Sequence, residues 1–511
     1  MSNDIDKRLL EYKKVRHLLP SKNKALCQRF HAVSGTSGAR GVKGTTRTRT
    51  KRMRHGHLTY YTNNGKTPVF GTIRRLGGKK DSADSEAYVV CPLKNNKCST
   101  DVRIALKNTP LKQYEKDLLL SHKKELGSLN ELYILKKTTE LFLQGKTNYL
   151  PILYGAYFCK KAHATDYANQ NIVKNYKSAP LMKKFNASIK DINDIIDILY
   201  NNHIFETKRD ELLSIARKQQ EVHDFLTYML NSDFSLSILT ELAYKDLGNF
   251  LSQNLFSPSF LSKHSYEHLS HVLISIIEQT IMGLYILHNH LNVAHLDIHM
   301  GNILVMGSKE QGLYKYIHKE YGSVYISHVN FYVLIWDYGR ALIVPPSARD
   351  TREVRDTRDT RAVRDLLETF YAKYKHEFAS FFTENEARLT ALFYSDSSSV
   401  QEYLIDRLFL MDYYMFFQKY SNKIHRSLRG AGTSGARTRA LKNLITILDK
   451  GNLIFERALT HDIIASNATS EAHASPLVAP LINHKNVLRL ILRKPPSKND
   501  VVYNKDKPIY I

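Results

Sequence analysis

The sequence contains HLDIHMGNILV at residues 295–305 and IWDYG at residues 335–339, and these two stretches decide the fold. Asp297 and Asn302 lie between a long helical pattern and a short apolar strand, and Asp337 ends the next predicted strand. Phosphoryl transfer requires an acceptor for the proton of the attacking hydroxyl and oxygen ligands for magnesium on the phosphates. Two carboxylates and a carboxamide supply those groups, because Mg²⁺ prefers hard oxygen ligands. The two stretches therefore predict magnesium-dependent phosphoryl transfer.

The segments around these stretches predict a β-rich region followed by a helix-rich region, which is an α+β fold class. Short runs of β-formers bounded by turn residues dominate the first half, and apolar residues at helical spacing dominate the second. The predicted strands are residues 86–93, 101–107, 151–158 and 235–243, and the predicted helical stretches are 115–145, 264–288 and 366–461. The first two strands flank the turn-like KNNKCST, so we expect them to pair as a hairpin.

The loop at residues 295–302, followed by Asp-Tyr-Gly at 337–339, resembles the catalytic loop and the magnesium-binding loop of the protein kinase superfamily. The resemblance implies a two-lobed protein kinase-like fold, with a small β-rich N-lobe and a larger α-helical C-lobe. It implies ATP and Mg²⁺ as cofactors. It also implies that Asp297 is the catalytic base and that Asn302 and Asp337 hold the metal.

The resemblance extends toward the N-terminus of the chain. VRIALK at residues 102–107 is similar to the strand that ends in the phosphate-binding lysine, which implies that Lys107 orients the phosphates of ATP. The following helix is similar to the one whose glutamate pairs with that lysine. This implies a pair between Lys107 and Glu131, with Glu125 as the alternative. A buried lysine without an acidic partner is costly, so one of the two should pair with it.

The segment TELAYKDLGNFL at residues 240–251 is similar to the hinge between the two lobes. The resemblance implies that backbone groups from Glu241 to Ala243 bind adenine and that Asp246 lies on the ribose side. The pattern ELxILKKxTEL followed by PxLYG, together with the compact catalytic loop, is most similar to the kinases of large DNA viruses.

The glycine-rich loop that covers the phosphates in this family is poorly matched. Gly77 and Gly78 are the candidates for it, but Ser85 stands where a last glycine is usual. Glycine lets the backbone approach phosphates without a side chain in between. Nucleotide affinity is therefore expected to be weaker than in the family.

The catalytic loop also departs from the family. Leu296 replaces the arginine that precedes the catalytic aspartate, so control through a phosphorylated activation loop is not expected. His299, which we include among the catalytic residues, replaces the usual lysine. A neutral histidine stabilises the charge of the transferring phosphate less. A histidine there is also similar to small-molecule kinases of the aminoglycoside and choline type.

The connection between Asn302 and Asp337 is long and tyrosine-rich, and it indicates an insertion between two short strands. No Ala-Pro-Glu signature follows the Asp-Tyr-Gly motif, and an Arg-rich segment takes its place. Asp365, just after that segment, is a candidate for the helix aspartate that braces the catalytic loop, with a solvated residue as the alternative.

The predicted domain organisation follows these motifs. A basic, largely disordered arm is followed by an N-lobe with an insertion near residues 160–230, then by a C-lobe with low-complexity inserts at 347–365 and 429–440, and by a tail. The bounds are 1–66 for the arm, 67–243 for the N-lobe, 244–465 for the C-lobe and 466–511 for the tail.

The composition limits the class of protein and its partners. The net charge of +25, from 74 Lys and Arg against 49 Asp and Glu, favours anionic partners, although solvated arms account for part of it. Four cysteines without a disulfide framework favour a reducing compartment with inert thiols. The first residues lack the apolar stretch of a signal peptide, and no run approaches 18 consecutive apolar residues, so we expect neither a signal peptide nor a membrane-spanning helix. We expect a protein that is not secreted, located in the cytoplasm of a host cell or in a virion if viral.

Three functions remain open from the sequence. The leading one is a serine/threonine protein kinase acting on a protein substrate, with acidic proteins favoured by the basic charge. A small-molecule kinase on the same fold is the second. The third is a pseudokinase scaffold whose basic arms contact nucleic acid non-specifically. The sequence does not indicate an oligomeric state.

Overall fold

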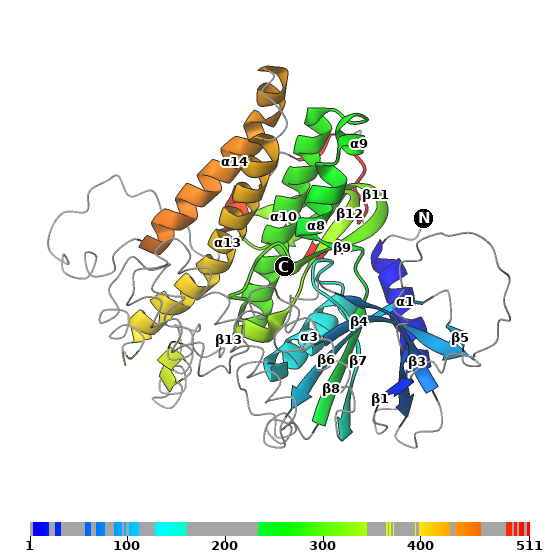
Figure 1. The fold of residues 1–511 in the computed structure, drawn as a ribbon. Helices are drawn as coiled ribbons and strands as arrows, with labels where there is room; N and C mark the ends of the chain where they lie inside the picture. The colour runs from blue at the N-terminus through cyan, green and yellow to red at the C-terminus, as the bar shows by residue number, and fades with distance from the viewer. Residues whose placement is uncertain are drawn as a thin grey trace, which may run out of the picture. The chain divides into compact units, whose positions relative to one another are not determined.

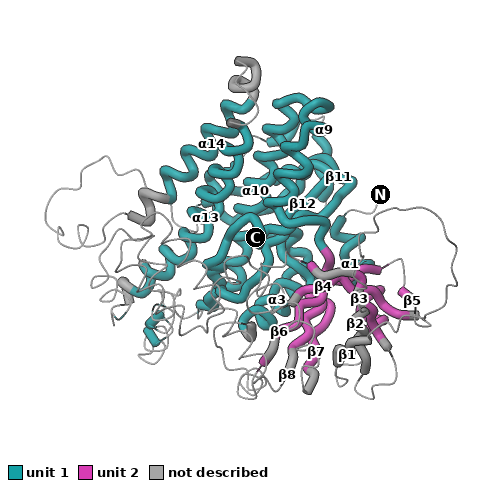
Figure 2. Tube along the Cα trace, in the orientation of Figure 1, with its two compact units in different colours: residues 1–12, 124–152, 243–511 teal, residues 13–123, 153–242 magenta. Residues whose placement is uncertain are grey.

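The computed structural model describes the parts of the chain that carry the candidate site and most of the predicted strands and helices. The described residues are 4–19, 26–31, 57–62, 68–76, 86–94, 97–98, 102–111, 128–160, 234–344, 364–365, 367–368, 371, 394, 398–429, 435–460, 487–492, 495–497, 500–504 and 508–511. They form a fold of mixed α and β content with a curled antiparallel sheet and helices (Figure 1), as the α+β prediction requires. Two compact units divide the chain (Figure 2), and each is described by itself.

Unit 2, residues 13–123 and 153–242, contains the curled antiparallel sheet. Its strands follow the order β1 (Leu26–His31), β2 (His57–Thr62), β3 (Pro68–Leu76), β4 (Glu86–Lys94), β6 (Ile104–Leu111), β8 (Phe234–Glu241) and β7 (Leu153–Lys160), and β5 (Lys97–Cys98) pairs with β4. The predicted hairpin is confirmed, because Glu86 of β4 pairs with Asn108 of β6 and the register continues to Val90 and Ile104. The latter two side chains are completely buried and belong to the core of this sheet.

The cysteines of this sheet differ from the expectation of inert thiols. Cys91 of β4 and Cys98 of β5 form a disulfide across the turn, with their Cα atoms 5.5 Å apart. Strands β4 and β5 pair antiparallel at Leu93 and Cys98, and this pairing brings the two cysteines together. Spacing in the sequence did not reveal the pairing, because it depends on the register of the strands.

Unit 1, residues 1–12, 124–152 and 243–511, is built around α10 (Tyr266–Leu291). Ser265 caps this helix by accepting a hydrogen bond from the backbone N–H of His268, and Asn292 ends it in the left-handed conformation. Among the described residues, α10 is the one helix long and apolar enough to cross a membrane. However, 89% of its apolar window is buried inside the protein, as in a central core helix.

A long antiparallel hairpin, β11 (Ile303–His318) and β12 (Gly322–Ile335), packs on α10. The predicted insertion between two short strands is wrong, because the tyrosine-rich connection continues both strands. Tyr314 and Tyr316 alternate with more exposed neighbours and are completely buried. This period of two is the pattern of a strand with one face in the core. Two short strands, β9 (Lys245–Asp246) and β14 (Ile509–Tyr510), pair with β11.

The helices of unit 1 complete its core. They are α3 (Ser128–Leu143), α8 (Leu247–Phe250), α9 (Pro258–Leu261), α13 (Ser398–Arg429) and α14 (Gly435–Thr460), with the short helical turns η1 (Leu251–Leu255), η2 (Tyr338–Arg340) and η4 (Val487–Leu490). Strands β10 (Val293–Ala294) and β13 (Leu342–Ile343) pair with each other, and the segment 295–341 lies between them in sequence. Helix α14 begins within the predicted low-complexity insert at 429–440.

The prediction of a disordered arm over residues 1–66 does not hold for its beginning, where α1 (Asp4–Leu18) forms. Arg8 is 5% exposed and donates to the carbonyl oxygens of Asn148 and Leu150, at 2.8 and 2.9 Å. Its guanidinium also lies over the rings of Phe142 and Tyr332. A basic residue can thus be buried when carbonyl groups and aromatic faces replace its water. The predicted tail likewise contributes β14 to the hairpin sheet.

Candidate active site

The hairpin brings two of the predicted magnesium ligands to the same end of one strand pair. Ile303 of β11 pairs with Ile335 of β12, so Asn302 and Asp337 lie just outside the first rung of the ladder. The backbone N–H of Trp336 donates to the carbonyl oxygen of Asn302 at 2.8 Å, which continues the ladder past that rung. An antiparallel register therefore places together two residues that are distant in sequence.

Asn302 also holds the predicted base. Its Nδ2 donates to the backbone carbonyl of Asp297 at 2.9 Å and lies 3.3 Å from Asp297 Oδ2. The turn between them is closed by His299, whose carbonyl accepts from the N–H of Asn302 at 2.9 Å and whose Nδ1 accepts from the N–H of Gly301 at 3.0 Å. These bonds fix the loop and leave Oδ1 of Asn302 as an oxygen that can face a cation.

The electrostatic surroundings of Asp297 suit a proton acceptor. Burial raises the pKa of Asp297 above its ordinary value, and the nearby charge of Asp337 raises it further. Arg340 and His299 lower the pKa, as does the hydrogen bond from Asn302. Arg340 Nε lies 3.9 Å from Asp297 Oδ2, and the side chains of these two residues are 45% and 27% exposed. Asp297 is thus the partly exposed member of a charged group at the end of the hairpin.

Asp412, a residue that no sequence motif indicated, binds the backbone at the start of this loop. Its Oδ2 accepts from the backbone N–H of His295 at 2.7 Å, and its Oδ1 accepts from that of Leu296 at 2.6 Å. His288 Nε2 of α10 lies 2.8 Å from Oδ2. Leu296 has a positive φ of 59°, and the Asp412 carboxylate compensates by binding its N–H. Burial raises the pKa of Asp412 to about 6, while these N–H groups lower it.

The structure corrects the choice of Asp365 as the bracing aspartate. Asp365 has a side chain that is 61% exposed and lies 3.6 Å from Arg364. Asp412 of α13 takes that place, and its side chain is completely buried. The signal was available in LFLMDYYMFF, where a single acidic residue stands in an apolar run. A buried charge is costly unless it is paired. A single acidic residue in an apolar helix therefore predicts a buried interaction partner.

His295 links this support to the magnesium-type loop. Its Nε2 lies 2.8 Å from the carbonyl oxygen of Trp336, the residue before Asp337. Asp337 itself adopts the left-handed conformation with φ of 65°, and Tyr338 donates its hydroxyl to the carbonyl of Ile335 at 2.7 Å. Because a carbonyl oxygen can only accept, Nε2 of His295 donates this hydrogen bond. The two loops are therefore joined by a direct side-chain contact.

No known family model and no curated protein sequence matches this chain. The case for an active site therefore depends on the motifs and on the contacts described above. These contacts bring Asp297, Asn302 and Asp337 to one end of the hairpin in unit 1.

The predicted phosphate-binding pair is divided between the two units. Lys107 lies in β6 of unit 2, partly buried, opposite Ala87 of β4 and Ile238 of β8. Glu131 lies in the first turn of α3 in unit 1 and is 1% exposed. Its charge raises the pKa of the buried Tyr338, which is chiefly raised by burial. The proposed pairing of lysine and glutamate thus stays a prediction.

Of the predicted hinge residues, Asp246 lies next to the candidate site within unit 1. Strand β9 pairs Asp246 with Leu304 of β11, two residues after Asn302. Asp246 caps α8, because its Oδ1 accepts from the N–H of Asn249 at 2.9 Å. Ala243 begins this part of unit 1, whereas Glu241 ends β8 of unit 2 and is buried.

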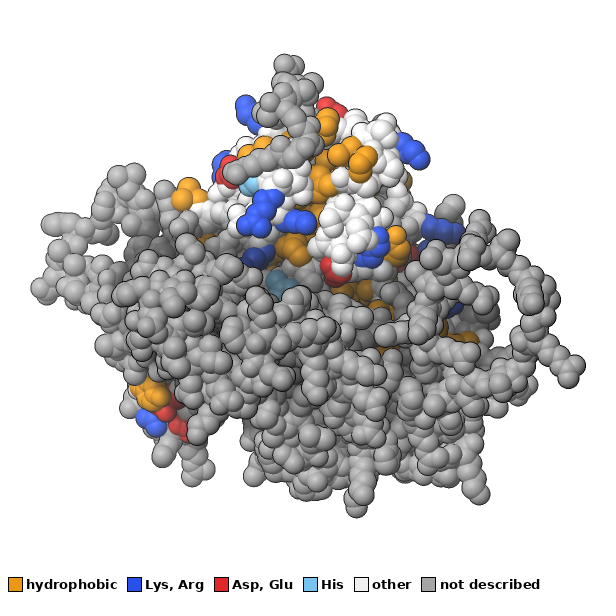
Figure 3. Space-filling view, viewed as in Figure 1, with side chains coloured by type: hydrophobic (Ala, Val, Ile, Leu, Met, Phe, Trp, Pro, Cys, Tyr) orange, Lys and Arg blue, Asp and Glu red, His pale blue; other side chains and the backbone are white. Residues whose placement is uncertain are grey.

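The remaining nucleotide-site candidates, Gly77, Gly78 and Glu125, lie outside the described residues, as does most of the basic arm. On the face drawn in Figure 3, Lys and Arg side chains of the described part stand in separate small groups rather than in one continuous patch. The predicted contact with nucleic acid therefore stays a prediction.

Proposed function

We propose that this chain is a protein kinase of the two-lobed type, which transfers the terminal phosphoryl group of ATP to hydroxyl groups of a protein substrate. Asp297 accepts the proton of the substrate hydroxyl, and Asn302 and Asp337 hold the magnesium ion. The observation that carries the proposal is the connected loop pair: Asn302 binds Asp297, and the rung after Asn302 positions Asp337.

The donor set at this end of the hairpin fits Mg²⁺. Asp337 and Asn302 offer a carboxylate and an amide oxygen, which are hard ligands of the kind that Mg²⁺ prefers. When bound, Mg²⁺ neutralises charge on the phosphates of ATP. The chain's own contribution is to hold Asp297 beside this site, where Arg340 and His299 oppose the rise in its pKa that burial causes.

Arg340 supports transfer in a second way. The family resemblance places a lysine where this chain has the exposed His299. Arg340 supplies a permanent positive charge 3.9 Å from Asp297 Oδ2, on the loop that follows Asp337. This charge stabilises the phosphoryl group as negative charge redistributes during transfer. Lys107 is assigned to the phosphates by the resemblance alone.

A phosphorylation assay tests the proposal. The full chain is incubated with Mg²⁺ and labelled ATP, together with casein, histone and a panel of hydroxyl-bearing metabolites, and label is followed into each. We expect label in protein, with little in the metabolites. Asp297→Asn should abolish most of it, and Asp449→Asn, an exposed aspartate on α14, serves as the matched control.

Two outcomes contradict the proposal. Label that enters metabolites but not protein would replace it with a small-molecule kinase. Absence of any transfer, together with no increase in the melting temperature on addition of Mg²⁺ and ATP, would indicate a pseudokinase.

A further inference from the structure

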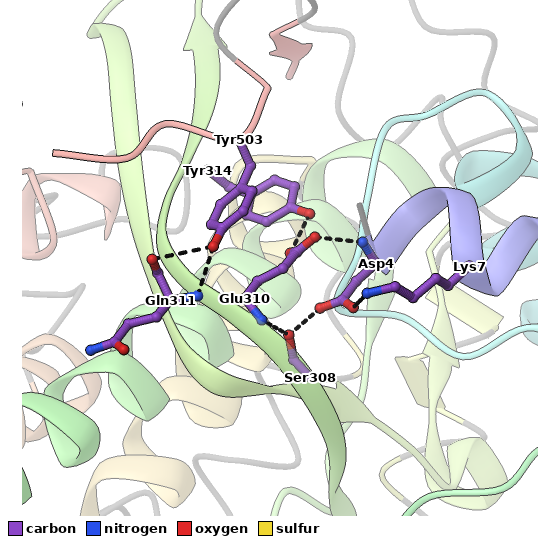
Figure 4. Close-up of polar contacts among 7 residues, drawn as sticks. All are labelled: Asp4, Lys7, Ser308, Glu310, Gln311, Tyr314 and Tyr503. Carbon is purple, nitrogen blue, oxygen red and sulfur yellow. Dashed lines mark hydrogen bonds and ion pairs between the residues drawn. The ribbon is translucent and has the colours of Figure 1, made fainter. Parts of the chain in front are cut away.

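A second buried polar cluster lies in unit 1, away from the loop of Asp297. It joins Asp4, at the start of α1, to the β11–β12 hairpin (Figure 4). Glu310 lies where the register of the hairpin shifts between Gly307 and Gln311, so its side chain leaves the regular alternation of the strand. His328 lies on β12. Asp4, Glu310 and His328 are 6%, 4% and 1% exposed.

The two carboxylates of this cluster are close together. The backbone N–H of Asp4 donates to Glu310 Oε1 at 2.6 Å, Tyr314 donates to Glu310 Oε2 at 2.7 Å, and the Ser308 hydroxyl donates to Asp4 Oδ2. Lys7, which is half exposed, lies 3.2 Å from Asp4 Oδ1, and Figure 4 draws no contact between it and Glu310. One partly solvated lysine offsets at most one of two buried negative charges. Burial of a second charge is costly unless a proton or a cation accompanies it.

His328 provides a second observation, separate from the carboxylates, that points to a cation. Its Nε2 lies 2.9 Å from the hydroxyl of Tyr149, whereas its Nδ1 is buried and has no hydrogen-bond partner among the described residues. When the tyrosine oxygen accepts the Nε2 proton, Nδ1 presents a lone pair. A hydrogen bond at one ring nitrogen and a metal at the other is the usual arrangement of a histidine ligand.

His318 of the same hairpin shows how a buried histidine is satisfied without a metal. Its Nε2 contacts the hydroxyl of Tyr285 at 2.7 Å, as His328 contacts Tyr149. Its Nδ1, however, accepts from the backbone N–H groups of Glu320 and Tyr321, at 3.0 and 3.2 Å. The two histidines therefore differ at one nitrogen, and the unsatisfied one belongs to the ring beside the carboxylates.

We propose that Asp4, Glu310 and His328 bind one divalent transition-metal ion of the Zn²⁺ class. One carboxylate oxygen from each acid and one ring nitrogen of His328 all lie within 4.8 Å of one another. Zn²⁺ accepts both carboxylate oxygens and imidazole nitrogens as ligands, and a site with three protein ligands is completed to a tetrahedron by water. The ion balances both buried charges and fastens α1 to the hairpin. This site is independent of phosphoryl transfer at Asp297.

Metal binding by the full chain tests the proposal. The protein is stripped with a chelator and dialysed, and Zn²⁺ is then titrated by calorimetry, with bound metal counted by mass spectrometry. Wild type should bind one equivalent at this site and His318→Leu should bind like wild type. His328→Leu should lose at least a factor of 100 in affinity for that equivalent. Co²⁺ substitution should give the visible absorption of a tetrahedral site, without the charge-transfer bands of cysteine ligands.

A second variant guards against misfolding. Glu310→Gln keeps the size and one acceptor oxygen of the side chain, and it should also lose the equivalent while its circular dichroism matches wild type. Unchanged zinc affinity in both His328→Leu and Glu310→Gln would overturn the proposal. A wild-type chain that binds no equivalent would do the same, and would indicate that a shared proton neutralises the carboxylates.

Discussion

Asp297 belongs to the loop at residues 295–302 and Asp412 binds the backbone of that loop, and the surroundings of the two carboxylates differ. Asp412 is completely buried, and two backbone N–H groups and the imidazole of His288 meet its oxygens. Asp297 is partly exposed and meets the amide of Asn302 and, at longer range, the guanidinium of Arg340. The carboxylate that holds the backbone, Asp412, is excluded from solvent, and hydrogen-bond donors surround both of its oxygens. The carboxylate that would act on substrate keeps an open side.

The largest expected effect separates the two roles by activity. Asp297→Asn should lower the rate of phosphoryl transfer by on the order of a thousandfold, about 4 kcal/mol in the activation barrier, because the proton acceptor is lost. Its melting temperature should stay within a few degrees of wild type, since the side chain is partly exposed. Kinetics and calorimetry on the same sample make the measurement. A rate near wild type would remove Asp297 from its role.

The second effect reverses this pattern. Asp412→Ala should lower the free energy of unfolding by about 3 kcal/mol, because it leaves buried N–H groups of His295 and Leu296 without an acceptor. Chemical denaturation measures the change. The control is Asp449→Ala, whose carboxylate is 63% exposed and 3.7 Å from His425, and which should change stability very little. Equal stability of the two variants would contradict the bracing role of Asp412.

A third effect concerns pH. The pKa of Asp412 is about 6 in the folded protein and about 3.9 in an unfolded chain. Between these values the folded state binds a proton that the unfolded state has released. The contribution of Asp412 to stability therefore falls as pH rises from about 4 to about 6, by on the order of 2 kcal/mol. Denaturation of wild type and Asp412→Asn across this range should give a stability difference that changes by this amount, because the other titrating groups contribute to both proteins; parallel curves would contradict it.

The smallest expected effect is the influence of Arg340 on the pKa of Asp297. Arg340 lowers the pKa of Asp297, so Arg340→Ala should raise it and move the acid limb of the pH–rate profile to higher pH, by less than about one unit because both groups are partly solvated. Arg340→Lys keeps the charge and should leave the limb in place. A shift to lower pH in Arg340→Ala would show that Arg340 does not act on Asp297 through its charge.

The sequence was sufficient for features that are set by local spacing. The loop from Asp297 to Asn302, the hairpin of β4 and β6 and the long helix α10 all lie where their patterns predict. The brace was missed because Asp412 meets Leu296 across 116 positions of sequence. No local pattern encodes such a distance. Only the isolated acid in an apolar helix pointed to it.

Average composition predicts the wrong structure in two places. The average charge of the N-terminal arm predicts disorder. Arg8 nevertheless donates hydrogen bonds to backbone carbonyl groups, and α1 forms. The stretch between Asn302 and Asp337 was judged by its length, although the alternation around Tyr314 and Tyr316 is that of a strand. In both cases the pattern of individual residues carried more information than the average.

The β11–β12 hairpin also determines how this protein can change over generations. Its turn, at residues 319–321, stands at the far end of the ladder from Asn302 and Asp337. Matched additions to both strands at the turn would lengthen the ladder and leave the first rungs untouched. A single extra residue in one strand, near Ile335, would reverse the facing of whatever follows. Insertions are therefore tolerated when both strands gain the same number of residues at the turn.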